Sequence, residues 1–222
     1  MRCIEFSLKF EMRMNLVSYF IIMVLSLPAV FSVVFADIIT CASEVKVCNG
    51  TNGDDVIIGN KIDNIISGLN GSDTLIGLEG NDNISGGERY DVLIGHEGND
   101  RLLGGDGSDE ILGGTGNDYV EGGYGADQIM GGEGNDTLIG NDGGDEINGG
   151  PTDDLIMGGS GADELIGGPG DDKIYHNLES TTSLPDGSKD VIICGDGNDE
   201  VWINVQRDGD EANKDCEIVH TS

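Results

Sequence analysis

Apolar residues recur along this chain with a period of nine. From Thr51 to His176 fourteen nine-residue units follow one another without insertion or deletion, and the seventh residue of every unit is Ile, Leu or Val. Because successive side chains of a strand point to opposite faces, the seventh residue faces inward and its two neighbours face outward. The pattern therefore predicts a short strand at positions six to eight of each unit, beginning with 56–58 and 65–67.

The polar and glycine positions of each unit are as regular as the apolar one. The fifth residue is Asp in thirteen units, the ninth is Gly in thirteen, and the third is Gly in eleven. Glycine permits backbone conformations that are closed to residues with a Cβ, and this much glycine excludes a regular helix. Turn, strand, turn and strand then close one coil of eighteen residues. We predict an all-β, right-handed β-solenoid with two parallel sheets and the seventh residues between them.

Units such as Gly131-Gly132-Glu133-Gly134-Asn135-Asp136-Thr137-Leu138-Ile139 resemble the glycine-rich nonapeptide of the hemolysin-type calcium-binding (RTX) family, written G-G-x-G-x-D-x-U-x. The resemblance covers 51–176 and resumes in phase at 186–203. It implies a parallel β-roll that binds calcium. Residues 177–185 are one unit long but lack the motif, and we interpret them as a degenerate or looped-out repeat.

Fifth-position residues of alternate units should stack into two columns at a spacing of about 4.8 Å. Carboxylates at this spacing repel one another, and a hard cation with six to eight oxygen ligands would remove the repulsion. A ligand set made only of oxygen favours Ca²⁺ over Zn²⁺ or Cu²⁺. We therefore predict calcium as the cofactor, with ions bound between neighbouring coils and up to about twelve ions in the whole roll.

The predicted metal ligands are the fifth-position carboxylates, the two in-phase carboxylates near the carboxyl end, and carbonyl oxygens of third-position glycines. They are Asp55, Asp73, Asp82, Asp91, Asp100, Asp109, Asp118, Asp127, Asp136, Asp145, Asp154, Asp163, Asp172, Asp190, Asp199, Gly116, Gly125, Gly134, Gly143 and Gly161. Asn64 interrupts one column, and Ile62, Arg89 and Thr152 replace the third-position glycine. We expect weaker sites beside these four residues.

The chain is strongly acidic, with a formal net charge of −31. This charge excludes a nucleic-acid partner, which needs a basic surface, and argues against binding to anionic membranes. Acidity is also typical of disordered chains. The repeat predicts a folded chain when metal is bound, so we expect disorder only in the metal-free state. The metal sites are assembled by folding and do not exist in the unfolded chain.

The amino end differs from the rest in composition. Arg2, Lys9 and Arg13 precede an apolar run from Leu16 to Ala36, which is typical of a signal peptide over 1–36. An uncleaved membrane anchor is the alternative, because the run is long enough to span a bilayer. We then expect an amino-terminal cap at 37–50, the calcium-binding roll at 51–203 and a carboxyl-terminal cap at 204–222. The predicted location is extracellular or cell-surface associated, without membrane contact after cleavage.

Four of the five cysteines flank the repeats. Cys41 and Cys48 precede the first repeat, Cys194 lies in the last one, and Cys216 follows it. An even set in an exported chain is typical of disulfides. We predict the pairs Cys41–Cys48 and Cys194–Cys216, which would close the two ends of the roll.

The eighth position is apolar in most units of one predicted sheet. The residues are Ile58, Ile76, Ile94, Leu112, Met130 and Ile166, with Asn148 as the interruption. An exposed apolar stripe is typical of an interface, here with a protein or glycan partner. The alternative is the ordinary preference of such residues for strands.

No set of residues with catalytic spacing can be identified, so we predict that the protein is not an enzyme. The favoured hypothesis is a secreted calcium-binding repeat protein that serves as a structural or adhesive surface module. The alternatives are a calcium-dependent module that recognises a carbohydrate or protein, and a non-catalytic accessory subunit of a secreted hydrolase or epimerase.

Overall fold

The computed structural model describes residues 37–177, 188–203 and 209–221, so the expected signal peptide at 1–36 lies outside the described residues. The odd-numbered strands are β1 (Asp37–Thr40), β3 (Asp55–Asn60), β5 (Thr74–Glu79), β7 (Val92–Glu97), β9 (Glu110–Thr115), β11 (Gln128–Glu133), β13 (Glu146–Asn148), β15 (Glu164–Pro169), β17 (Val191–Asp196) and β19 (Glu211–Ala212). The even-numbered strands are β2 (Val47–Asn49), β4 (Ile65–Asn70), β6 (Asn83–Glu88), β8 (Arg101–Asp106), β10 (Tyr119–Tyr124), β12 (Thr137–Asp142), β14 (Leu155–Ser160), β16 (Lys173–Tyr175), β18 (Glu200–Ile203) and β20 (Ile218–Thr221).

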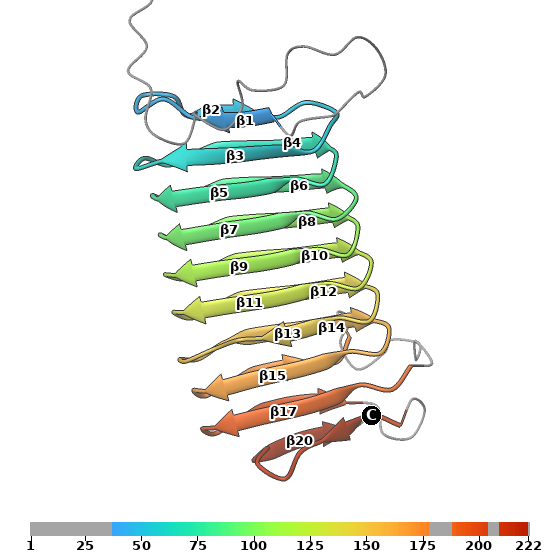
Figure 1. The fold of residues 1–222 in the computed structure, drawn as a ribbon. Coiled ribbons are helices and arrows are strands. Elements are labelled where there is room, and N and C mark those ends of the chain that lie inside the picture. The colour runs from blue at the N-terminus through green and yellow to red at the C-terminus, as the bar shows by residue number, and fades with distance from the viewer. Residues whose placement is uncertain (1–36, 178–187, 204–208, 222) are drawn as a thin grey trace, which may run out of the picture. The chain divides into compact units, whose positions relative to one another are not determined.

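Two parallel sheets face each other along the stack (Figure 1). Odd-numbered strands form one sheet in sequence order, and even-numbered strands form the other. Neighbouring strands are one coil apart, as in the pairing of Tyr119 with Thr137. The predicted all-β parallel solenoid with two units per coil is confirmed. Within the described residues, no helix is long and apolar enough to span a membrane.

Most strands are six residues long, whereas the sequence pattern predicted three. In β10 the pairing includes Tyr119, Val120 and Glu121, omits Gly122, and resumes at Gly123 and Tyr124. The chain therefore bends at the ninth-position glycine and continues into a second paired segment. The prediction of three-residue strands was wrong because the first two residues of the next unit also join the ladder.

The core contains one apolar residue from each unit. The seventh-position side chains from Ile57 to Val201 are at most 3% exposed and form one continuous cluster between the sheets. Removing each such side chain from water contributes about 1.5–3 kcal/mol. Because this core is narrow, the stability of the roll also depends on the interactions in its turns.

The first and third positions of most units place the backbone in the left-handed region. Third-position Gly134 has φ 123° and first-position Gly132 has φ 112°. Six residues other than glycine also occupy such positions, namely Leu69, Leu78, Arg89, His96, Asn141 and Thr152. An L-residue with a Cβ pays roughly 1–2 kcal/mol for this conformation. The glycines are therefore required by the turns.

The spacing between paired strands changes near the carboxyl end. Strand β17 pairs with β15 through Glu164 and Val191, which are 27 residues apart instead of 18. Strand β17 therefore joins the odd-numbered sheet, next to β15. Most of the segment interpreted as a degenerate or looped-out repeat, 177–185, lies outside the described residues. As a result, Asp190 stacks on Asp163 and not on Asp172, which is eighteen residues before it.

The segments expected to cap the roll also provide strands. Strands β1 and β2 pair with β3 and β4, and β19 and β20 pair with β17 and β18. Both predicted disulfides are present, with Cα separations of 6.1 Å for Cys41–Cys48 and 5.2 Å for Cys194–Cys216. Cys41, Cys48 and Cys194 are buried in the cluster of core residues. Each end of the roll is thus a disulfide-linked coil.

Candidate metal centre

Each turn of the roll buries one aspartate side chain. Every fifth-position aspartate is at most 3% exposed, and so are the two in-phase aspartates and Asp210. The buried carboxylates are Asp55, Asp73, Asp82, Asp91, Asp100, Asp109, Asp118, Asp127, Asp136, Asp145, Asp154, Asp163, Asp172, Asp190, Asp199 and Asp210. They form one column along each side of the roll, and all fifteen predicted aspartate ligands lie in these columns.

One oxygen of each column carboxylate after Asp55 joins adjacent coils. The Oδ1 atom of Asp118 accepts a hydrogen bond of 2.8 Å from the backbone N–H of Asp100, and Asp136 does the same for Asp118. The ladder continues in both columns with distances between 2.6 and 3.2 Å. The sequence analysis did not anticipate this role. Aspartates in such turns commonly bond to their own local backbone, whereas here the partner is a full coil away.

The second oxygen of most of these carboxylates is buried without a hydrogen-bond partner among the described residues. The atoms are the Oδ2 oxygens of Asp73, Asp82, Asp91, Asp100, Asp109, Asp118, Asp127, Asp136, Asp145, Asp154, Asp172 and Asp199. A buried polar atom left unsatisfied costs about 1–3 kcal/mol, and more if it is charged. A repeated cost of this kind indicates that a ligand belongs there.

The same burial changes the acidity of the carboxyl groups. Burial raises the pKa of Asp82, Asp109, Asp136 and Asp172 to about 6, and that of Asp91, Asp118, Asp145 and Asp154 to about 7. Hydrogen bonds from the preceding coil lower these pKa values, but burial outweighs them. Neighbouring aspartates of the same column add to the rise for Asp91 and Asp118. Without a cation, these groups would hold protons near neutral pH.

Backbone carbonyls lie beside the unsatisfied carboxylate oxygens. A Cβ built on ninth-position Gly68 would come within 3.0 Å of both Asp73 Oδ2 and the carbonyl oxygen of Gly86 in the next coil. The same arrangement recurs at Gly104 with Asp109. The inside of each turn therefore holds oxygen atoms from two coils and leaves no room for a side chain. These ninth-position carbonyls were missed from the sequence.

The predicted third-position glycines line the gap between coils as well. Gly116, Gly125, Gly134, Gly143 and Gly161 all have φ between 122° and 146°. A Cβ on Gly134 would overlap the carbonyl oxygen of Gly116, and one on Gly143 would overlap that of Gly125. The carbonyls of Gly116, Gly125 and Gly143 thus face the neighbouring coil, as expected for groups that could complete an oxygen shell.

The donor atoms in the turns fit calcium. Carboxylate and carbonyl oxygens are the ligands that Ca²⁺ takes, in groups of six to eight and in flexible geometry. The orphaned Oδ2 atoms would supply the charge and the glycine carbonyls the remaining oxygens. Calcium bound there would offset the repulsion within each column and satisfy the buried oxygens.

The irregular units differ locally. Asn64 keeps its place in the column, where its Oδ1 accepts from Asn60 N–H and its Nδ2 donates to the Val45 carbonyl. In the described residues no ion pair joins Arg89 to Asp91, and the pKa of Asp91 is still raised to about 7. The weaker calcium site expected beside Arg89 stays a prediction.

Three residues of the columns were not identified from the sequence. Asp210 Oδ1 accepts from Asp190 N–H, and Glu217 Oε2 accepts from Asp199 N–H, so each continues a column by one coil. His176 lies against Asp190 and Asp210. Glu217 follows Asp199 by eighteen residues, a signal that could have found it, whereas Asp210 follows Asp190 by twenty.

Comparison with known families agrees with this geometry. A family model that describes four copies of the RTX calcium-binding nonapeptide repeat matches several overlapping segments of the chain. The segments are 49–84, 76–111, 85–120, 103–138, 121–156 and 148–178. Together these segments cover 49–178, more than half of the chain. No curated protein matches the chain.

Proposed function

Because the chain belongs to the RTX calcium-binding nonapeptide repeat family, we propose that calcium folds it into a non-catalytic structural or adhesive module outside the cell. RTX nonapeptide repeats bind Ca²⁺, so the chain is a calcium-binding repeat protein with multiple sites. The observation that carries the proposal is the pair of columns of buried carboxylate oxygens without hydrogen-bond partners.

We assign the calcium ligands to the oxygens of these columns. They comprise the predicted aspartates and third-position glycines, together with the ninth-position carbonyls represented by Gly86. The support for this assignment is the convergence of carboxylate and carbonyl oxygens on the inside of each turn. A roll held by so many identical sites would be rigid and repetitive, and such a surface suits support or adhesion better than catalysis.

An extracellular location is supported by the cysteines. Two disulfides persist only in an oxidising compartment, and each one joins residues at an end of the roll. The apolar segment from Leu16 to Ala36 is consistent with an export signal. We expect a mature amino terminus at Asp37, which intact mass measurement of the exported protein tests directly. An unprocessed terminus would favour the membrane-anchor alternative.

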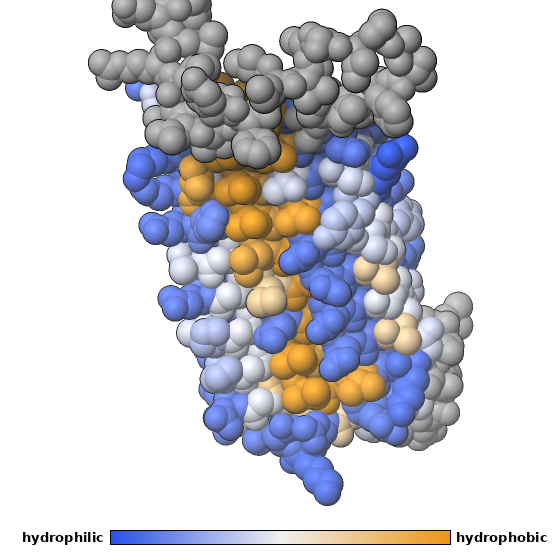
Figure 2. Space-filling view, in the orientation of Figure 1, coloured by the Kyte–Doolittle hydropathy of each residue, from blue (hydrophilic) through white to orange (hydrophobic). Residues whose placement is uncertain are grey.

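The outer face of the odd-numbered sheet supports an adhesive role. Figure 2 shows apolar residues gathered along this face, with a polar interruption in its middle. Of the predicted stripe, Met130 is 56% exposed and Leu112 36%, while Ile58, Ile76, Ile94 and Ile166 are half-buried by their neighbours. The same face is what a calcium-dependent recognition module for a glycan or protein would use, which is the second candidate function.

Calcium dependence is tested by titrating the chelated protein while recording circular dichroism and Trp202 fluorescence. We expect cooperative gain of strand signal at about 10⁻⁴–10⁻³ M calcium, the range of extracellular modules. Strand content that does not change between chelator and calcium would contradict calcium-driven folding.

Surface binding is tested separately with immobilised protein, a glycan array and intact cells, with and without calcium. The variant Leu112→Thr with Met130→Thr keeps strand-forming residues but removes the exposed apolar groups. Leu103→Thr on the other sheet is the matched control. We expect loss of binding only in the first variant. Retention of specific glycans alone would favour the recognition module, and equal binding by all three proteins would reject this face as the contact surface.

A further inference from the structure

His176 occupies a place that is reserved for glycine in every other coil of its column. It is the ninth residue of the last of the fourteen consecutive units. Its counterparts are Gly50, Gly68, Gly86, Gly104, Gly122, Gly140 and Gly158. At each of these glycines a Cβ would lie within 3.0 Å of the Oδ2 atom of the following aspartate. The ninth position is therefore directed at the carboxylate column, and at 176 an imidazole stands there.

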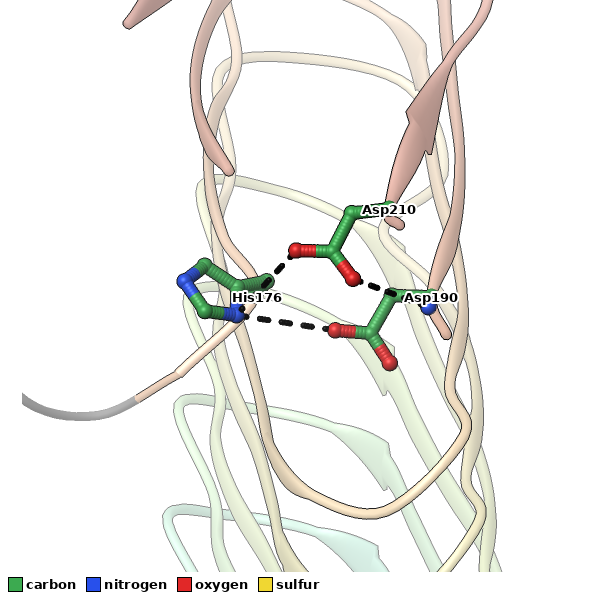
Figure 3. A group of neighbouring side chains, drawn as sticks. All are labelled: His176, Asp190 and Asp210. Carbon is green, nitrogen blue, oxygen red and sulfur yellow. Dashed lines mark hydrogen bonds and ion pairs between the residues drawn. The ribbon is translucent and has the colours of Figure 1, made fainter. Parts of the chain in front are cut away.

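The imidazole meets two carboxylates instead of one. His176 Nδ1 lies 3.6 Å from Asp190 Oδ2 and 3.6 Å from Asp210 Oδ2 (Figure 3). The three ligand atoms all lie within 4.8 Å of one another. Both carboxylate side chains are buried, and the imidazole is only 14% exposed. Three potential ligands of a metal ion thus converge in a nearly closed space.

The two carboxylates are held in this orientation by backbone donors. Asp190 Oδ1 accepts from Asp163 N–H at 2.9 Å, and Asp210 Oδ1 accepts from Asp190 N–H at 3.2 Å. These bonds leave the Oδ2 atoms turned toward His176. Metal ligands are commonly fixed by hydrogen bonds of this kind from a second layer of groups. The cluster is thus preorganised in the fold.

The donor set differs in kind from the calcium sites. Imidazole nitrogen suits zinc, copper, iron and nickel, whereas calcium takes oxygen. Zinc binds nitrogen and carboxylate oxygen at about 2.0–2.2 Å in tetrahedral geometry, so two of its ligands lie roughly 3.4 Å apart. The observed separations of 3.6 Å match this closely. Three protein ligands also leave a fourth position for water, as in open zinc sites.

We propose that His176, Asp190 and Asp210 form one transition-metal site of the zinc type, at the end of an otherwise calcium-binding column. Asp190, counted above among the calcium ligands of its column, would bind this ion in place of calcium. The three residues are the one after β16, the one before β17 and the one before β19. A bound ion would therefore link the last coils of the roll. This proposal does not depend on the adhesive role.

The competing explanation is an ion pair without metal. A protonated His176 between two buried carboxylates would offset their charge by itself. The two explanations differ in what happens when zinc is added to the calcium-saturated chain. Zinc must displace the Nδ1 proton to bind, whereas a fixed imidazolium would keep it.

The test is calorimetric titration of the full chain with Zn²⁺ in saturating calcium, so that the oxygen sites are already occupied. We expect one zinc per chain, and Co²⁺ in its place should give the visible absorption of a four- or five-coordinate ion. His176→Gln should lower zinc affinity by at least about tenfold, since even loss of a supporting group costs 10–100-fold. His96→Asn, at an exposed histidine of β7, should leave the zinc affinity unchanged.

Asp210→Asn provides a second variant if His176→Gln alters the fold, which circular dichroism in calcium will reveal. It keeps an oxygen for the Asp190 N–H and removes one charged ligand. The absence of a stoichiometric zinc site in the unaltered chain would overturn the proposal. So would a zinc affinity that is the same in the unaltered chain, in His176→Gln and in Asp210→Asn. An imidazolium NMR signal at His176 that persists with excess zinc would assign the cluster to an ion pair only. Failure of zinc binding would leave calcium-driven folding unaffected, so the two conclusions are tested independently.

Discussion

Without calcium, the stability of the folded roll should depend on pH, and the buried carboxylates determine whether it rises or falls. The pKa of eight column aspartates is raised from 3.8 to about 6 or 7 in the roll, chiefly by burial. In the unfolded chain the same groups titrate near 3.9. The folded chain therefore binds protons more tightly than the unfolded one. Their contribution to stability is complete below about pH 4 and is lost as the pH rises through 6 to 7.

The size of this effect decides whether the metal-free roll survives at neutral pH. A rise from 3.8 to about 6 or 7 corresponds to about 3–4 kcal/mol per carboxyl at pH 7, so a few such groups are enough to offset the stability of a whole domain. A typical domain is stable by only about 5–15 kcal/mol. We therefore expect the metal-free chain to be unfolded at pH 7.5 and to gain strand structure as the pH falls toward 4.

The assay is circular dichroism with Trp202 fluorescence in calcium-free buffer containing a chelator, from pH 8 to pH 4. Because the sequence pI is about 4.1, sedimentation must show that the acidic sample is not aggregated. Replacing Asp118, Asp136 and Asp154 by Asn keeps the Oδ1 acceptors and removes three charges, so folding should then need less acid. A chain that is already strand-rich at pH 7.5 in chelator, or one that gains no strand on acidification, would refute the reasoning.

Three further predictions follow from individual contacts. Asp118→Asn should raise the calcium concentration needed for folding by several-fold, while Glu133→Gln removes an exposed charge and should shift it little; equal shifts would mean that only net charge matters. Gly134→Ala should destabilise the calcium-loaded roll by more than about 2 kcal/mol in urea unfolding, because its Cβ would overlap the Gly116 carbonyl in a left-handed turn, whereas Gly53→Ala meets only ordinary contacts and should be near neutral. Cys194→Ser should lower stability by about 3 kcal/mol, since the bond to Cys216 closes 22 residues; an unchanged urea midpoint would show that the last coil is held without it.

The columns of carboxylates could be predicted because the repeat is local and regular. A strand alternates its faces, so a nine-residue period fixes which residue enters the core and which one returns to the same turn. The same regularity brought Cys41 close to Cys48 and Cys194 close to Cys216. The metal type followed from residue chemistry, since Asp and glycine carbonyls offer only oxygen.

The double use of each carboxylate was not visible in the sequence. The spacing placed Asp118 over Asp100, but only the stacked backbones show that Oδ1 of Asp118 accepts from Asp100 N–H while Oδ2 remains unsatisfied. Likewise, the involvement of ninth-position carbonyls depends on how two coils face each other. These features arise from the distance and orientation between coils, which no single unit contains.

The sequence by itself determined the period, the inward residues, the two columns and the end disulfides of this calcium-binding repeat protein. Only the tertiary structure decided that β17 pairs with β15, because the local pattern of the repeat at 186–203 fits a place in either sheet. That choice moved Asp190 from the column of Asp172 to that of Asp163 and brought it to His176 and Asp210. The physical reason is that register between coils is set by the pairing of whole strands, not by the residues of any one repeat.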